Sequence, residues 1–374
     1  MTTQAVVSRT GVRWGTLTAC YAVVHGLGEF LTALTLFSMT SSWTDLALLI
    51  VVYNALAFGC PLLIASFLVA SRIERISEGQ MGLAGAVLMA TGMMVAQLPW
   101  ACVVLLGLGS AMLHIAAGTA TLKLGSRKGT AVGVFESTGA FGLALGGVLG
   151  LGVWHQVAAT PWIGLGALVM VIGGGAVLAW GTPAVGAIAA DVPSTSGFPA
   201  FARTELALAP RPGWALLGAV GLLALISVVR ATIGLTAPSP WKEGTALILV
   251  AALAVALGRA VGGIITDRWG YRLPALVGLL SVGIFLGLFP TALGAGLVGC
   301  FLLGCTMAPL IVALVDTIGR PSLAFGMAQF CQVPAAILVG LVYPSWVIIV
   351  LMAICALLLL AVKPLSDRRI NAPL

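Results

Sequence analysis

The chain has 374 residues, of which 60% are hydrophobic and only 8% are charged. Soluble domains carry about 25% charged residues, so this composition excludes an ordinary soluble protein and is typical of a polytopic membrane protein. The formal net charge of +7 does not predict nucleic-acid binding, because the basic residues occur in small groups between apolar stretches and form no patch interleaved with aromatic residues.

Apolar stretches with the length of a membrane-spanning helix, about 20 residues, recur along the chain. They predict an all-α membrane protein with twelve transmembrane helices. The expected ranges are 14–38, 44–69, 80–98, 100–122, 130–153, 161–180, 213–237, 244–266, 273–290, 292–316, 322–343 and 345–362. All seven cysteines fall inside these ranges without metal-finger spacing, which favours small buried hydrophobic side chains over disulfides or zinc ligands.

The basic residues indicate the orientation of these helices. Cytoplasmic loops carry an excess of Lys and Arg. Nearly all basic residues outside the spans fall at the chain ends or in even-numbered loops, and Lys242 is the exception. Both termini are therefore expected to be cytoplasmic, and most Trp residues fall at span ends, as expected for an aromatic belt at the bilayer surface.

A polar segment rich in Pro, Ser and Thr divides the expected spans six and six. It covers residues 181–212 and is expected to be a cytoplasmic linker. The chain would then consist of an N-terminal six-helix bundle, residues 1–180, and a C-terminal six-helix bundle, residues 213–374.

Two pairs of short stretches indicate that the bundles are duplicated. GLGSAMLH at 107–114 can be laid over LGCTMAP at 303–309, and GVFES at 133–137 over GMAQF at 326–330. Both pairs lie in corresponding spans of the two halves. We therefore expect two pseudo-symmetric bundles.

Few ionisable residues lie inside the expected spans. Each costs about 2.5 to 3.5 kcal/mol at the bilayer centre, so each marks a candidate functional site. The set comprises His25, Glu29, His114, Glu136 and Arg230, with Arg259 and Asp316 nearer to the cytoplasmic ends.

His25 and Glu29 are four residues apart and so share one helix face, with Tyr21 a further turn below. Counted from Trp14 at 1.5 Å per residue, they lie about 16 and 22 Å into the span, near the middle of the bilayer. Titratable groups at that depth suit a proton carrier. The alternative is a His–Glu pair that only satisfies its own hydrogen bonds inside the bundle.

Arg230 follows Trp214 at nearly the same interval as Glu29 follows Trp14. The duplication would place Arg230 and Glu29 at similar depths on equivalent helices. A guanidinium group binds carboxylate or phosphate through two parallel hydrogen bonds, so Arg230 is expected to hold an anionic group of a substrate together with Glu29, His25 and Tyr21. A fixed ion pair between the bundles is the alternative.

His114 and Glu136 fall at similar depths on neighbouring spans and could pair as a second proton-coupling group. Their counterparts in the duplication are Pro309 and Gln329, which do not titrate. Asp316 is expected to anchor a loop through Arg320.

Three methionines in the third span raise the possibility of a soft metal site. Met89, Met93 and Met94 could join His25 or His114, although a methionine stripe at helical spacing is usually packing. No metal ligand set and no cofactor are expected.

The segment GRAVGGIITDRWGYR, residues 258–272, closely resembles the loop signature G-x-x-x-D-R-x-G-x-R of the major facilitator superfamily. The matching positions are Gly263, Asp267, Arg268, Gly270 and Arg272. The resemblance implies an alternating-access transporter fold and a gating role for these residues, which we extend to Arg259. Its glycines would allow close helix packing, while Asp and Arg would form a charge latch between helices.

A narrower resemblance covers the first, fourth and fifth spans. GLGSAMLHIAAGTATLKLGSRKGTAVGVFES and HGLGE are similar to stretches of fosmidomycin-resistance-type exporters. This resemblance implies efflux.

Together these patterns predict a proton-coupled secondary transporter of a small, anionic organic solute. We expect a monomer in a lipid bilayer, the inner membrane of a bacterium, with protons and a small-molecule substrate as its partners. Two alternatives are a transition-metal transporter with His, Glu and Met ligands and a membrane assembly or sensor protein that does not transport. An enzyme is not expected, because the sequence has no P-loop, nucleophile elbow or metal-hydrolase spacing.

Overall fold

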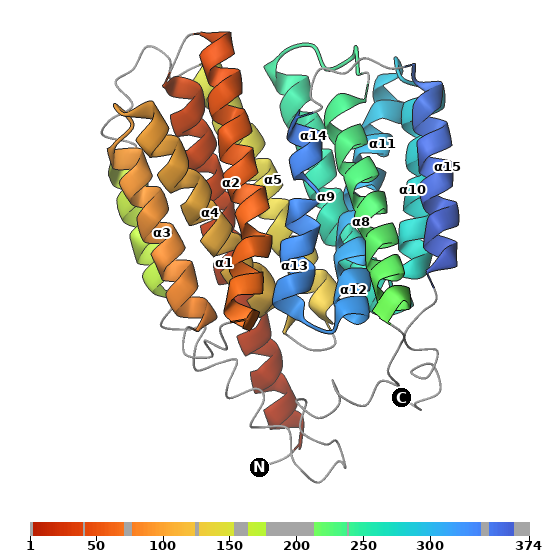
Figure 1. Ribbon diagram of the computed structural model, residues 1–374, viewed down its shortest axis with the longest axis horizontal. Coiled ribbons are helices and arrows are strands. Elements are labelled where there is room, and N and C mark those ends of the chain that lie inside the picture. The colour runs from red at the N-terminus through yellow and green to blue at the C-terminus, as the bar shows by residue number, and fades with distance from the viewer. Residues whose placement is uncertain are drawn as a thin grey trace.

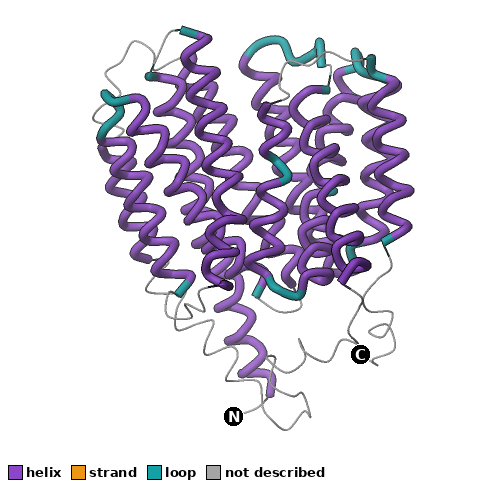
Figure 2. The backbone as a smooth tube through the Cα atoms, viewed as in Figure 1, coloured by secondary structure: helices purple, strands orange, loops and turns teal. Residues whose placement is uncertain are grey.

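The computed structural model describes residues 3–39, 42–70, 77–123, 127–152, 164–176, 213–237, 239–337 and 344–362. Within these ranges every regular element is a helix, as Figure 2 shows. Seven of the described helices are long and apolar enough to cross a membrane, with Leu293–Ile318 counted as one. The fold is therefore all-α, as the composition predicts, while the expected linker at 181–212 lies outside the described residues.

The first group of helices occupies one side of the molecule (Figure 1). It consists of α1 (Thr3–Ser38), α2 (Trp43–Ala70), α3 (Glu78–Met94), α4 (Pro99–Leu122), α5 (Lys128–Gly152) and a shorter helix at Gly164–Ala176. Glycines let these helices touch through their backbones, since a Cβ atom at Gly142 or Gly146 of α5 would lie 2.1 Å from a carbonyl oxygen of α1. Small residues have this role in membrane helices.

The second group occupies the other side (Figure 1). It consists of α8 (Gly213–Thr236), α9 (Thr245–Trp269), α10 (Arg272–Leu288), α11 (Leu293–Cys305), α12 (Met307–Ile318), α13 (Pro321–Phe330), α14 (Val333–Ile337) and α15 (Trp346–Ala361). A helix lies within every range expected from the sequence, and the number of spans and the sidedness of the termini stay predictions.

Two expected helices are interrupted. The range 292–316 is divided into α11 and α12 at Thr306, and the range 322–343 into α13 and α14 at residues 331–332. Pro309 and Pro334 lie in the first turn after each break, and proline removes the N–H that a continuous helix would use.

The two groups meet through two matched backbone contacts. A Cβ atom at Gly133 of α5 would lie 2.5 Å from the Arg259 carbonyl oxygen of α9, and one at Gly326 of α13 would lie 2.9 Å from the Leu62 Cα of α2. Gly133 and Gly326 are aligned with each other in the predicted duplication. The contacts between the groups thus follow the internal symmetry of the sequence.

Candidate functional site

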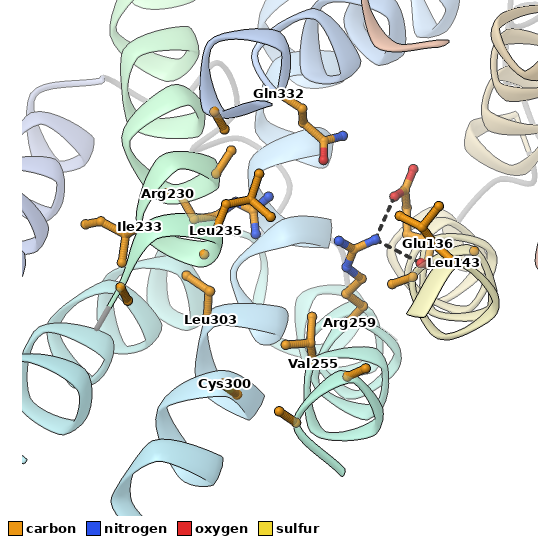
Figure 3. A pocket seen from close by; sticks show the side chains of 18 of the residues that line it. Glu136, Leu143, Arg230, Ile233, Leu235, Val255, Arg259, Cys300, Leu303 and Gln332 are labelled. Carbon is orange, nitrogen blue, oxygen red and sulfur yellow. Dashed lines mark hydrogen bonds and ion pairs between the residues drawn. The ribbon is translucent and has the colours of Figure 1, made fainter. Parts of the chain in front are cut away.

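A cavity of about 380 Å³ lies between the two groups of helices (Figure 3). Six ionisable residues singled out in the sequence line it: His25, Glu29, His114, Glu136, Arg230 and Arg259. Most other lining residues are apolar, among them Phe58, Leu143 and Leu303. Glu29 and Arg230, which come from different halves of the sequence, therefore face one space.

The cavity has a closed end and an end at a loop. It extends from Glu136 and Arg259 to Ser239 and Lys242, in the connection between α8 and α9. That connection and the start of α1 lie at opposite ends of the molecule (Figure 1). Between Arg259 and the C-terminal end of α9, the backbones of α5 and α9 are in contact. A Cβ atom at Gly263 would lie 2.2 Å from the carbonyl oxygen of Gly129.

Two histidines from different helices meet in the cavity wall. The Nε2 atoms of His25 on α1 and His114 on α4 are 3.0 Å apart. His25 Nδ1 lies 2.8 Å from the carbonyl oxygen of Phe135, and His114 Nδ1 lies 2.8 Å from that of Ser110. The His25 ring also stacks on Phe135 with centroids 4.1 Å apart. Both histidine rings are therefore held at Nδ1 by a backbone carbonyl oxygen.

Glu29 is joined to this pair through hydroxyl groups that the sequence analysis did not identify. Tyr53 on α2 donates to Glu29 at 3.0 Å, and Ser110 Oγ donates to Glu29 at 2.9 Å. Ser110 Oγ also lies 3.1 Å from His114 Nδ1. Glu29, Ser110, His114 and His25 thus form one continuous hydrogen-bonded chain. The position of Ser110, one turn before His114 on the same helix face, was the available signal.

Glu136 has other partners than expected. Its carboxylate accepts from Arg259 Nη1 at 3.1 Å and from Gln329 Nε2 at 2.7 Å, and Gln332 donates to Gln329. The expected pairing with His114 is wrong, because Glu136 reaches across to α9 and α13 whereas His114 is turned toward α1. This group lies at the closed end of the cavity.

Arg230 is a buried cation without a carboxylate partner among the described residues. Its side chain is on α8, the residue is only 5% exposed, and its Nη2 donates to the sulfur of Met307 at 3.0 Å. A thioether is a weak acceptor. Figure 3 shows Arg230 and Arg259 entering the cavity from different helices, with only Arg259 bound to Glu136.

Several residues expected at the site lie elsewhere. Tyr21 is buried in the hydrophobic core and is not among the residues that line the cavity. Met89 and Met93 also belong to that core, whereas Met94 is exposed. The methionines therefore do not contribute to the candidate site.

One group of side chains in the described part of the chain is close enough to hold a metal ion. His25, Glu29 and His114 offer one ligand atom each within 4.8 Å of one another. Both Glu29 oxygens already accept hydrogen bonds, and the Nε2 atoms are at hydrogen-bonding separation. His25, Glu29 and His114 therefore form a hydrogen-bonded cluster.

In the signature segment 258–272, the acidic residue binds the start of a helix in the other group. The Asp267 carboxylate accepts the backbone N–H groups of Gly129 and Thr130 at 2.8 and 2.7 Å. The first N–H groups of a helix have no partner within it, and they attract negative charge. Asp267 of α9 therefore caps the first turn of α5.

The other residues of the signature lie around this cap. Arg272 donates to the carbonyl oxygen of Val362 at 2.7 Å, which connects α10 to the end of α15, and Gly270 has a φ of 74°. Arg268 is exposed and has no partner within the described ranges. Asp316 pairs with Lys128 instead of Arg320, because the start of α5 lies beside α12.

Comparisons with protein-family models and with curated proteins gave no match. Among solved structures, the chain is similar to a major facilitator superfamily transporter, FucP, crystallised in the outward conformation. The two are 14% identical, with a TM-score of 0.56, over 94% of this chain and 98% of that chain. At this identity the likeness concerns the fold: the chain has the fold of a major facilitator superfamily transporter.

Proposed function

We propose that the protein is a proton-coupled secondary transporter of a small organic anion. The bundles 1–180 and 213–374 would rock about the central cavity and expose it to either side of the membrane in turn. The transporter fold and the position of the cavity between the two groups of helices support this proposal. Twelve spans with both termini in the cytoplasm remain part of it.

Arg230 carries the anionic part of the proposal. A buried charge is costly unless an opposite charge accompanies it, yet the described partner of Arg230 is the sulfur of Met307. Arg259 differs because Glu136 already neutralises it. A carboxylate, phosphate or phosphonate in the cavity would supply the missing charge, and the apolar wall would contact the rest of the solute.

Glu29, His25 and His114 are the proposed proton carriers, and Glu136 is the proposed link to the closed end. These groups lie on α1, α4 and α5, whereas Arg230 lies on α8. Anion and proton would therefore be bound by different helix groups that share one cavity. The resemblance to fosmidomycin-resistance-type exporters favours efflux, so we propose exchange of the anion for a proton in a bacterial inner membrane.

Anion binding can be tested on the purified protein by thermal shift with a set of small carboxylates and phosphonates. A ligand at 100 times its Kd stabilises a protein by about 2.7 kcal/mol. We expect some anions to stabilise the wild type and the exposed-cation control Arg268→Gln, and the stabilisation to be lost in Arg230→Met. Equal stabilisation of Arg230→Met by every such anion would contradict the role of Arg230.

Proton coupling is tested with the stabilising anion in proteoliposomes. A pH gradient should drive movement of the anion by the wild type, and Glu29→Gln should abolish this dependence. Unchanged pH-driven transport by Glu29→Gln would exclude Glu29 as a proton carrier.

A further inference from the structure

The contacts of His25 and His114 indicate which of their ring nitrogens carry a hydrogen. Each Nδ1 atom lies 2.8 Å from a backbone carbonyl oxygen, of Phe135 and of Ser110 respectively. A carbonyl oxygen only accepts, so each Nδ1 must carry a hydrogen. The two Nε2 atoms are 3.0 Å apart, which is a hydrogen-bond distance and requires one further hydrogen between them.

This arrangement contains one proton more than two neutral rings can supply. A neutral imidazole carries one N–H and an imidazolium carries two. Two Nδ1–H groups and one shared Nε2–H therefore correspond to one imidazole and one imidazolium. Without the third hydrogen, two nitrogen lone pairs would face each other at 3.0 Å in a buried site.

We infer that His25 and His114 together bind one extra proton, shared between their Nε2 atoms, and that it is the coupling ion of the transporter. The extra proton is argued from the two Nδ1–carbonyl contacts and the Nε2–Nε2 contact, and its role as the coupling ion rests on the proposed function. From depth alone, His114 could pair with Glu136, whereas in the structure its ring contacts that of His25.

Glu29 balances the extra charge. Of the two carboxylates in the described cavity wall, Glu136 is engaged by Arg259, and Glu29 accepts only from hydroxyl groups. A ligand atom of Glu29 lies within 4.8 Å of those of both histidines. The charged groups that line the same cavity are Glu29 of α1, Glu136 of α5, Arg230 of α8, Lys242 before α9 and Arg259 of α9, and Tyr53 of α2 donates to Glu29. The nearest anion is therefore Glu29.

Ser110 offers a route for the proton to leave. The N–H bond at His114 Nδ1 breaks as its hydrogen passes to Ser110 Oγ, and the hydrogen of Ser110 passes to Glu29 Oε1, across distances of 3.1 and 2.9 Å. The products are two neutral rings, an intact serine hydroxyl and a neutral carboxyl group. The shared hydrogen ends on His114 Nε2, so His114 is neutral with its hydrogen on Nε2 and His25 is neutral with its hydrogen on Nδ1. Glu29 itself lines the cavity.

Nitrogen NMR can test the inference directly, because the chain has only three histidines. Protein labelled with ¹⁵N-histidine would be studied in nanodiscs at pH 7, and His155→Gln removes the third set of signals. We expect one ring with both nitrogens protonated, one neutral ring with its hydrogen on Nδ1, and a coupling between the two Nε2 nuclei. Two neutral rings in the wild type would overturn the inference, whatever the fate of any variant.

The role of Glu29 is tested in the same spectra. Glu29→Gln keeps the size of the side chain and removes its charge, so the extra proton should be lost, whereas the control Glu78→Gln, at a half-buried carboxylate that pairs with Lys123, should keep it. An imidazolium that persists in Glu29→Gln would overturn the charge balance, and signals that change on addition of EDTA would show a bound metal in place of the proton. Anion binding at Arg230 is measured separately, so either idea can fail alone.

Discussion

Glu136 on α5 accepts a hydrogen bond of 2.7 Å from Gln329 on α13. These two residues are aligned in the predicted duplication, so positions related by internal symmetry touch at the closed end of the cavity. One member of the pair carries a charge and the other does not. The arginine that completes the group, Arg259, lies on α9. The contact between the halves is therefore symmetric in position and asymmetric in chemistry.

The first prediction concerns the Glu136–Arg259 pair. Glu136→Gln would leave the largely buried Arg259 guanidinium without its counter-charge, and breaking a buried ion pair typically costs about 3 kcal/mol. We expect a clear loss of stability in chemical unfolding of the protein in nanodiscs. Glu78→Gln, which removes one partner of the more exposed pair with Lys123, should cost at most about 1 kcal/mol. Similar losses for both variants would contradict the structural role of the buried pair.

The second prediction concerns the close approach of α5 and α9. A methyl group at Gly263 would lie 2.2 Å from the Gly129 carbonyl oxygen. The backbones of α5 and α9 would have to move apart to make room for it. Gly263→Ala should destabilise the protein by about 1 to 3 kcal/mol. Gly218→Ala on α8 is the control, because nothing lies within 4 Å of its added Cβ, and it should be neutral or stabilising by up to about 1 kcal/mol. Equal unfolding midpoints for both variants would refute the close contact.

The third prediction concerns the cap that Asp267 forms on α5. Asp267→Ala removes both acceptors of the Gly129 and Thr130 N–H groups and should cost about 0.5 to 2 kcal/mol, as for other helix caps. Arg268→Gln, at the exposed neighbouring position, should change stability by less than about 0.5 kcal/mol. Thermal unfolding of the two variants side by side measures this difference, and a larger effect for Arg268→Gln would reverse the assignment.

The fourth prediction concerns the space for the His25 ring. A Cβ atom at Gly139 would lie 2.1 Å from His25 Cε1, so Gly139→Ala should displace the ring and abolish the coupling between the histidine Nε2 nuclei. Gly147→Ala on the same helix would meet only ordinary contacts, 3.5 Å from Phe37, and should leave the coupling intact. A coupling retained in Gly139→Ala would show that the ring lies elsewhere.

The sequence predicted the helices well because their cause is simple: an apolar stretch of about 20 residues can satisfy its backbone in lipid only as a helix. It also indicated five of the ionisable residues that line the cavity, since a buried charge is costly and therefore rare: His25, Glu29, His114, Glu136 and Arg230. Depth along a helix follows from counting residues, so the sequence alone was enough to expect Glu29 and Arg230 at similar levels.

Partners were harder to predict than positions. One residue turns a helix by about 100°, so depth alone did not show that Glu136 reaches Arg259 while His114 reaches His25. Tyr53 and Ser110 gave little signal, because a hydroxyl group in an apolar helix is common. The Asp267 cap could not be found from charge patterns, since its partners are backbone N–H groups.

The N-terminal part of α5 forms several ion pairs and hydrogen bonds with helices of the second group. Lys128 pairs with Asp316, Gly129 and Thr130 bind Asp267, and Glu136 binds Arg259 and Gln329. A rigid rotation of this one helix end would break these bonds together. The change of conformation in the proposed transport cycle should therefore be cooperative, with a single activation barrier, so that weakening any one of these bonds accelerates the whole transition.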